Sequence, residues 1–85
     1  MTNQEIELKV KEVVAKKLDA KIETLSATTR LAEDLGVDSF GAVELMFELE
    51  EKFGLKIPDS EIEHIRTIGD IVTYLDGWLK KSGKA

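Results

Sequence analysis

The sequence predicts an all-α fold, a small four-helix bundle of three longer helices and one short helix, with a long loop between the first two helices. Apolar residues recur at helical spacing in three segments, and a residue that favours a helix start precedes each of them. No segment shows the alternation of apolar and polar residues that is typical of a half-buried strand. A chain of 85 residues without internal repeats suits a single domain, residues 1–85.

The first helix is expected to follow Thr2, because Thr2 and Glu5 have the spacing of a capping box. The apolar stripe of this helix consists of Ile6, Val10, Val13, Val14 and Leu18. The periodicity fades over residues 19–38, which predicts a long loop with a helical turn near residues 31–35 and a left-handed turn at Gly36. Scattered apolar residues are expected to attach this loop to the core: Leu25, Leu31, Leu35 and Val37.

A second helix is expected over residues 39–53, with Gly54 as its C-terminal stop. Pro58 cannot continue a helix, and Asp59 after it is expected to cap a short helix over residues 60–65.

The last helix is expected to begin at Thr67, which forms a capping-box pattern with Asp70. Its core stripe consists of Ile68, Ile71, Val72, Leu75, Trp78 and Leu79. The lysine-rich tail, residues 80–85, is expected to fray.

The composition excludes several kinds of site. There is no cysteine, so disulfides and thiolate metal sites are excluded. No loop has the ligand spacing of a calcium site, and we assign no metal site. Because the N-terminal segment lacks the apolar stretch of a signal peptide and no run is long enough to cross a membrane, a cytoplasmic protein is expected.

The negative charge is concentrated in the middle of the chain. Residues 31–76 hold twelve acidic and three basic residues, whereas residues 1–30 hold five acidic and six basic residues. An acidic surface repels nucleic acid and anionic lipid and attracts basic protein surfaces. We therefore expect protein partners with basic surfaces, and neither nucleic acid nor a membrane. A solvated acidic face that only aids solubility has the same charge pattern.

The second helix is expected to carry large apolar residues on two faces. At about 100° per residue, one arc is expected to face the core, and it gathers Ala42, Leu45, Met46, Leu49 and Phe53. The other side gathers Phe40, Val43 and Phe47 among Glu44, Glu48, Glu50 and Glu51. Apolar side chains among carboxylates cannot lie in a dry core without burying charge. This side is typical of a docking surface for basic partners, unless the preceding loop covers Phe40.

Ser39 stands at the predicted start of this helix, and the sequence allows three roles for it. Either Ser39 or Asp38 can be the N-cap. A nucleophilic serine is disfavoured, because the string GVDSFG lacks the first glycine of a G-x-S-x-G elbow and His64 is the only histidine that could act as its base. A phosphate ester on Ser39 would lie at a helix N-terminus, where free N–H groups and the helix dipole favour anions.

Several segments resemble the acyl carrier proteins of fatty-acid and polyketide synthesis: EDLGVDSF at 33–40, VEL at 43–45, LEEKF at 49–53 and IPD at 57–59. The resemblance extends from the first helix to about Trp78 in unbroken register. It implies that Ser39, preceded by Asp38, carries 4′-phosphopantetheine, which a phosphopantetheinyl transferase takes from coenzyme A with magnesium. The thiol of this arm holds the acyl chain as a thioester, so the resemblance implies a carrier and not an enzyme.

The resemblance also implies where partners and cargo meet the carrier. Basic acyl-transfer and synthase enzymes would dock on the helix that starts at the serine, which corresponds to Phe40, Val43, Glu44, Phe47, Glu50 and Glu51. The family shelters acyl chains between its helices, and the candidates for an acyl cavity are Leu45, Met46, Leu49, Ile62, Ile65, Ile71 and Leu75. A monomer is expected, because the apolar surface is reserved for partners.

The sequence departs from the family pattern at several positions. Phe40 stands where leucine is usual, Gly41 where an acidic residue is common, and Glu48 and Ile62 where small residues are common. Ile62 is expected to narrow an acyl cavity. His64 and Arg66 add positive character near the short helix. These departures leave open a specialised carrier with its own synthase or ligase. The alternatives are an aminoacyl or peptidyl carrier and an unmodified protein-interaction module that uses the same acidic helix.

Overall fold

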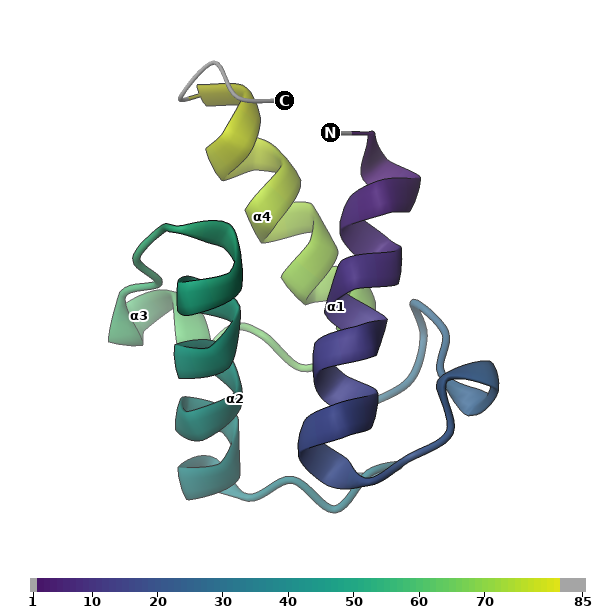
Figure 1. The fold of residues 1–85 in the computed structure, drawn as a ribbon. Coiled ribbons are helices and arrows are strands. Elements are labelled where there is room, and N and C mark those ends of the chain that lie inside the picture. The colour runs from purple at the N-terminus through teal and green to yellow at the C-terminus, as the bar shows by residue number, and fades with distance from the viewer. Residues whose placement is uncertain (1, 82–85) are drawn as a thin grey trace.

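The computed structural model describes residues 2–81 and confirms the predicted all-α bundle of three longer helices and one short helix. The longer helices are α1 (Asn3–Leu18), α2 (Ser39–Phe53) and α4 (Ile68–Lys81), and the short helix is α3 (Asp59–Ile62). In Figure 1, α1 runs in the opposite direction to both α2 and α4, and the long loop carries the chain from the end of α1 to the start of α2.

One apolar cluster holds the helices together. Most of its buried side chains come from one stripe of each long helix: Ile6, Val10 and Val14 of α1, Leu45, Met46, Leu49 and Phe53 of α2, and Ile68, Ile71, Val72, Leu75 and Leu79 of α4. The connecting segments contribute the others: Leu25, Leu31, Val37, Leu55 and Ile57. Trp78, which was predicted to belong to the α4 stripe, is only partly buried and packs against the cluster. The burial of these stripes stabilises the bundle through the removal of apolar surface from water.

Four predicted local features are confirmed, namely two capping boxes and two left-handed glycines. Thr2 and Glu5 exchange two hydrogen bonds of 2.9 and 3.2 Å, and Thr67 and Asp70 exchange the same pair at 3.1 Å each. Gly36 and Gly54 adopt the expected left-handed backbone, with φ of 69° and 66°. Each of these features depends on residues within one turn of each other, which is why the sequence contains enough information to predict them.

Two predicted helix boundaries are wrong. Pro58, and not Asp59, is the N-cap residue of α3, and the helix ends at Ile62 and not at residue 65. Beyond Ile62 the backbone forms the tighter bonds of a 3₁₀ turn, from the N–H of His64 to the carbonyl of Glu61 and from the next residue to Ile62.

The first two residues of the predicted tail are helical in this structure. Lys80 and Lys81 belong to the last turn of α4, where positive charge suits the negative end of the helix dipole. The ammonium group of Lys80 lies 3.0 Å from a carboxylate oxygen of Asp76, one turn earlier. The remainder of the predicted tail, residues 82–85, lies outside the described residues.

The loop between α1 and α2 is fixed to the start of α4 by backbone hydrogen bonds that the sequence did not predict. The N–H of Leu31 donates to Arg66, the N–H of Ile68 donates to Thr29, and the N–H of Gly69 donates to Ala27, over 2.9, 3.1 and 2.8 Å. Arg30 and Thr67 form an isolated antiparallel bridge within this contact, although no strand occurs in residues 2–81. The loop is therefore a packed part of the fold.

The local structure of this loop follows the prediction in part. Leu25, Leu31 and Val37 are buried and Leu35 is half-buried, as expected for residues that attach the loop to the core. The helical turn predicted near residues 31–35 is present, because the N–H of Asp34 donates to the carbonyl of Arg30 and the N–H of Gly36 donates to the carbonyl of Ala32. The turn does not continue into a helix. A 3₁₀ turn, η1 (Ile22–Thr24), was not predicted.

Candidate functional site

Ser39 is the first residue of α2, and its side chain is exposed. Asp38 is the N-cap, because its carboxylate accepts the N–H of Gly41 over 2.7 Å. A Cβ at position 41 would lie 3.1 Å from this carboxylate oxygen, so a side chain there would require the Asp38 carboxylate to shift by a few tenths of an ångström. The hydroxyl of Ser39 has no hydrogen-bond partner within residues 2–81, so it is available for chemistry and does not serve as the cap.

The surroundings of the Ser39 hydroxyl favour an anion. The first N–H groups of a helix have no acceptor within the helix, and the capping carboxylate of Asp38 takes only the N–H of Gly41. The N–H groups of Ser39 and Phe40 therefore remain at the positive end of the dipole of α2. A phosphate ester on Ser39 would meet hydrogen-bond donors and a favourable potential at this position.

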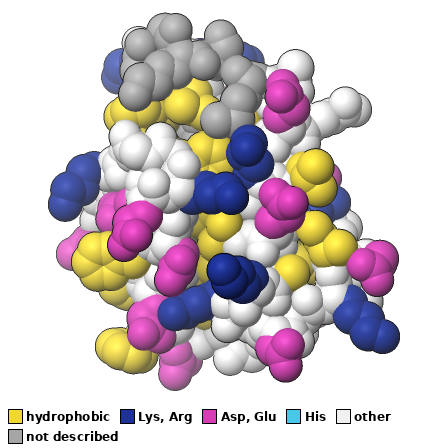
Figure 2. Space-filling view, in the orientation of Figure 1, with side chains coloured by type: hydrophobic (Ala, Val, Ile, Leu, Met, Phe, Trp, Pro, Cys, Tyr) yellow, Lys and Arg dark blue, Asp and Glu magenta, His cyan; other side chains and the backbone are white. Residues whose placement is uncertain are grey.

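The N-terminal half of α2 exposes an apolar strip. The exposed fractions of Phe40, Val43 and Phe47 are 71%, 44% and 60%, so the preceding loop does not cover Phe40. Three acidic residues accompany the strip on this helix: Glu44 is half-buried, and Glu48 and Glu51 are exposed. Figure 2 shows apolar and acidic side chains interspersed on the side of the molecule where α2 lies. Exposed apolar surface with a charged rim is characteristic of contact sites.

Glu50 differs from the other docking candidates because its carboxylate holds the backbone. It is half-buried, and one carboxylate oxygen accepts the N–H of Ile57 over 2.7 Å. Its carbonyl also accepts the N–H groups of Gly54 and Leu55. Burial raises the pKa of the nearby Tyr74 phenol, and the negative charges of Glu61 and Glu50 raise it further. Glu50 thus fixes the connection between α2 and α3.

A groove of about 460 Å³ opens beside Ser39. The loop, the start of α2 and the segment from α3 to α4 each contribute to its lining: Leu31, Ala32, Glu33, Val37, Asp38, Ser39, Ala42, Val43, Asp59, Ile62, Glu63, Ile65 and Arg66. Of the predicted cavity residues, only Ile62 and Ile65 line this groove. Sequence reasoning missed the contribution of the loop, for which the only signal was the unusual length of a segment rich in apolar residues.

The other predicted cavity residues lie in the closed core. Leu45, Leu49, Ile71 and Leu75 are fully buried, and Met46 is 1% exposed. Met46 also contributes to another groove, of about 410 Å³, together with Phe47 and Ile57. This groove shares Val43, Asp59 and Ile62 with the groove beside Ser39. The core residues therefore support the helices that carry the site, and the open space next to Ser39 lies at the surface.

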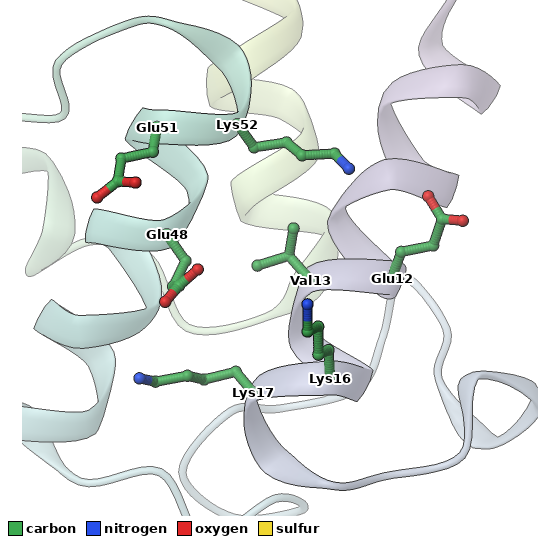
Figure 3. Close-up of a pocket in the computed structure, with 7 residues that line it drawn as sticks. All are labelled: Glu12, Val13, Lys16, Lys17, Glu48, Glu51 and Lys52. Atoms are coloured by element: carbon green, nitrogen blue, oxygen red, sulfur yellow. The ribbon is translucent and has the colours of Figure 1, made fainter.

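A third hollow, of about 590 Å³, lies between α1 and α2 and does not include Ser39. Figure 3 shows Val13 in its interior, with Lys17 extending from α1 toward Glu48 on α2, and Lys52 extending from α2 toward α1. Opposite charges on the two helices attract each other across this hollow, although none of these side chains forms an ion pair within the described part of the chain.

The described residues contain no group of three or more histidine, cysteine or acidic side chains that could hold a metal ion. Within the same range, no helix is long and apolar enough to cross a membrane. His64 is exposed in the segment after α3 and does not line the groove that contains Ser39. In the described part of the chain, no side chain forms a hydrogen bond with the Ser39 hydroxyl.

The comparisons with known proteins agree with this geometry. Residues 8–75 match the family model described as a phosphopantetheine attachment site. The acyl carrier protein of Rickettsia bellii (strain RML369-C) is 47% identical over 70 residues, which cover 82% of this chain and 81% of that protein. The acyl carrier protein of Campylobacter fetus subsp. fetus is 47% identical over 72 residues, which cover 85% and 92%.

Two solved structures have the same fold. An acyl carrier protein from Enterococcus faecalis matches with a TM-score of 0.73 at 32% identity, over 88% of this chain and 95% of that chain. A structure from Mycobacterium tuberculosis matches with a TM-score of 0.80 at 29% identity, over 86% and 97%. The fold and the matched residues thus define a helical domain with a phosphopantetheine attachment site. The chain belongs to the acyl carrier protein family, whose members are non-catalytic carriers.

Proposed function

We propose that this protein carries acyl intermediates as thioesters on a 4′-phosphopantetheine arm attached to Ser39. The observation that carries the proposal is the exposed Ser39 hydroxyl, which has no hydrogen-bond partner in residues 2–81, at the first turn of α2. In the proposed attachment, the Ser39 oxygen attacks the phosphorus of coenzyme A that bears the pantetheine group. The bond from this phosphorus to the second phosphate breaks, adenosine 3′,5′-bisphosphate leaves, and a base of the transferase takes the hydroxyl proton.

The residues around Ser39 suit such an arm. The N–H groups at the start of α2 stabilise a phosphodiester, and the apolar side chains of Val43, Ile62 and Ile65 line the groove beside it. When bound, the arm supplies the thiol that a chain without cysteine lacks. We propose one carrier domain over residues 1–85, a monomer in the cytoplasm, in fatty-acid, polyketide or a related specialised biosynthesis.

Intact mass measurement tests the attachment. The protein is incubated with coenzyme A, magnesium and a phosphopantetheinyl transferase of broad specificity, and we expect a gain of one phosphopantetheine group. Ser39→Ala is expected to abolish the gain. Ser60→Ala is the matched control, because Ser60 is also exposed near the start of a helix, and this variant is expected to be modified like the wild type. Modification of the Ser39→Ala protein, or no modification of the wild type by several transferases, would refute the proposal.

We further propose that basic partner enzymes dock on the apolar strip and acidic rim of α2. Phe47→Ala is expected to slow transfer of the arm about tenfold, equivalent to roughly 1.4 kcal/mol of binding, and Glu44→Lys is expected to slow it through charge reversal. Leu8→Ala is the matched control, because Leu8 is 54% exposed but lies on α1. Equal effects of Phe47→Ala and Leu8→Ala on transfer, or loss of helical signal in the Phe47→Ala protein, would contradict a docking role.

An unmodified interaction module is the competing function, since the strip on α2 could bind a partner without any arm. The mass measurement separates the two functions, because such a module would remain unmodified. Single-turnover loading from acyl thioesters of fatty acids, amino acids and polyketide extender units then separates acyl carriers from aminoacyl carriers.

A further inference from the structure

The charges that line the groove beside Ser39 are unbalanced. Four of the lining residues carry carboxylates, namely Glu33, Asp38, Asp59 and Glu63, and one carries a cation, Arg66. A phosphodiester on Ser39 would bring a further negative charge to this acidic rim, and like charges that line one groove repel each other. Apart from the N–H groups of α2, Arg66 is the only lining group that can offset that repulsion.

The backbone of Arg66 is held on both sides, while its guanidinium group is free. The N–H of Arg66 donates to the Asp70 carboxylate over 3.0 Å, and its carbonyl accepts the N–H of Leu31 over 2.9 Å. Its side chain is exposed, and the guanidinium has no hydrogen bond or ion pair within residues 2–81. The position of the Cα is therefore fixed by the fold, and the charged end can turn into the groove.

Arg30, on the loop side of the same junction, is in the opposite situation. Its guanidinium donates to the Asp34 carboxylate over 3.2 and 3.4 Å and lies 4.0 Å from a carboxylate oxygen of Glu33. These carboxylates raise the pKa of the Arg30 guanidinium, with the hydrogen bond to Asp34 as the main cause. Arg30 is thus committed to the loop, which leaves Arg66 as the uncommitted arginine at this junction.

We propose that Arg66 binds the phosphodiester that joins the arm to Ser39 and so turns the arm toward the groove wall formed by Ile62 and Ile65. The inference rests on the proposed attachment at Ser39. A guanidinium suits this role because its planar donors match the geometry of two phosphate oxygens, and charge-assisted hydrogen bonds of this kind are strong. Arg66 is then a positioning residue that selects the direction of the arm.

NMR of loaded proteins tests the proposal. Wild-type protein, Arg66→Gln, Arg66→Lys and Lys56→Gln are loaded by the transferase, and loading is verified by intact mass. The ³¹P resonance of the phosphodiester and the Nε–Hε resonance of Arg66 are then recorded before and after loading. Lys56→Gln is the matched control, because it removes one exposed positive charge from a residue that lines other grooves and not this one.

We expect the Arg66 Nε–Hε resonance to move on loading and the ³¹P resonance of Arg66→Gln to differ from that of the wild type. Lys56→Gln should superimpose on the wild type, and Arg66→Lys should lie between wild type and Arg66→Gln. The difference should disappear in about 1 M salt, where the screening length is about 3 Å. The backbone bonds of Arg66 use only main-chain atoms of that residue, so the unloaded variants should melt like the wild type.

Identical ³¹P resonances in loaded wild type and Arg66→Gln, or an unmoved Arg66 resonance, would overturn the inference. A carboxylate on the cargo is the other anion that Arg66 could bind, so acetyl-loaded and succinyl-loaded proteins are compared. A movement of the Arg66 resonance only in the succinyl form would assign Arg66 to the cargo and refute the proposal. Failure of the wild type to load refutes the attachment itself, which separates the two claims.

Discussion

The contact between Gly69 and Ala27 leads to a sharp prediction about stability. Gly69 is the second residue of α4, and its N–H donates to the Ala27 carbonyl over 2.8 Å. A Cβ at position 69 would lie 2.8 Å from that same oxygen, a distance that real Cβ contacts do not reach. Because the neighbour is backbone and not a flexible side chain, Gly69→Ala must displace the loop from α4.

The magnitude follows from two opposing effects. Inserting a methyl group into a closely packed contact costs about 1–3 kcal/mol. Replacing glycine in a helix interior by alanine contributes up to about 1 kcal/mol, and less at the second position of a helix. We expect Gly69→Ala to lower the free energy of unfolding by about 1–2 kcal/mol. For a domain of this size, that corresponds to a fall in Tm of roughly 4–16 °C.

Gly77 provides the control within the same helix. A Cβ at position 77 has no atom within 4 Å, so Gly77→Ala is expected to raise the free energy of unfolding by about 0.5–1 kcal/mol. Urea unfolding followed by circular dichroism measures both variants, and amide exchange of Gly69 and Ile68 locates the effect. The reasoning is refuted if Gly69→Ala is as stable as the wild type, or if the two glycines respond alike.

Two further predictions concern carboxylates that accept backbone hydrogen bonds. Glu50→Ala is expected to lower the free energy of unfolding by about 1 kcal/mol and to speed amide exchange at Ile57, because the N–H of Ile57 loses its acceptor. Glu51→Ala alters an exposed side chain and should do neither. Equal exchange rates at Ile57 in the two variants would count against a structural Glu50. The Arg30 backbone N–H and then its side chain lower the pKa of the Asp34 carboxyl. Since this folded pKa lies below the unfolded value, its stabilisation is complete above the unfolded pKa and is lost as the pH falls through the folded pKa. The stability difference between wild type and Asp34→Asn, measured by urea unfolding from about pH 6 to pH 2, should therefore shrink on acidification, and a constant difference would contradict it.

The fold could be predicted from the sequence wherever its determinants are local. The capping pairs Thr2–Glu5 and Thr67–Asp70 lie three residues apart, and their hydrogen bonds form as the spacing indicates. The two faces of α2 also follow from the helical period alone, which is why Phe40 and Phe47 were expected at the surface and are found there.

Long-range contacts could not be predicted in the same way. The contact of Gly69 with Ala27 joins residues that are 42 positions apart, and nothing near either residue indicates it. The hydrogen bond from the N–H of Ile57 to the Glu50 carboxylate spans the end of α2 and the turn after it. The helical period alone placed Glu50 on the exposed side of α2, so the sequence assigned it to docking alone. Both contacts depend on how the chain returns onto itself, which periodicity and capping do not encode.

The groove beside Ser39 also depends on contacts between residues that are far apart in the sequence. Ile62 and Ile65 were expected next to a cargo, but Leu31 and Val37 reach the groove only because the loop is bonded to the start of α4. Within residues 2–81, Leu45 and Leu75 are buried without open space beside them, and their role next to an acyl chain stays a prediction. In a close-packed interior such residues fill space, and open volume remains only where elements diverge.

The order of the two residues at the start of α2 explains how one helix end serves both structure and chemistry. The N-cap side chain must bend back to accept an N–H, and Asp38 does so toward Gly41 over 2.7 Å. Were the two residues exchanged, the serine hydroxyl would take that N–H and lie against the backbone. Because Asp38 serves as the cap, the hydroxyl of Ser39 at the next position is not needed for capping and projects into solvent. It lies beside the helix N–H groups that Asp38 does not bind. The adjacent pair thus separates the stabilising role from the reactive one at a single helix terminus.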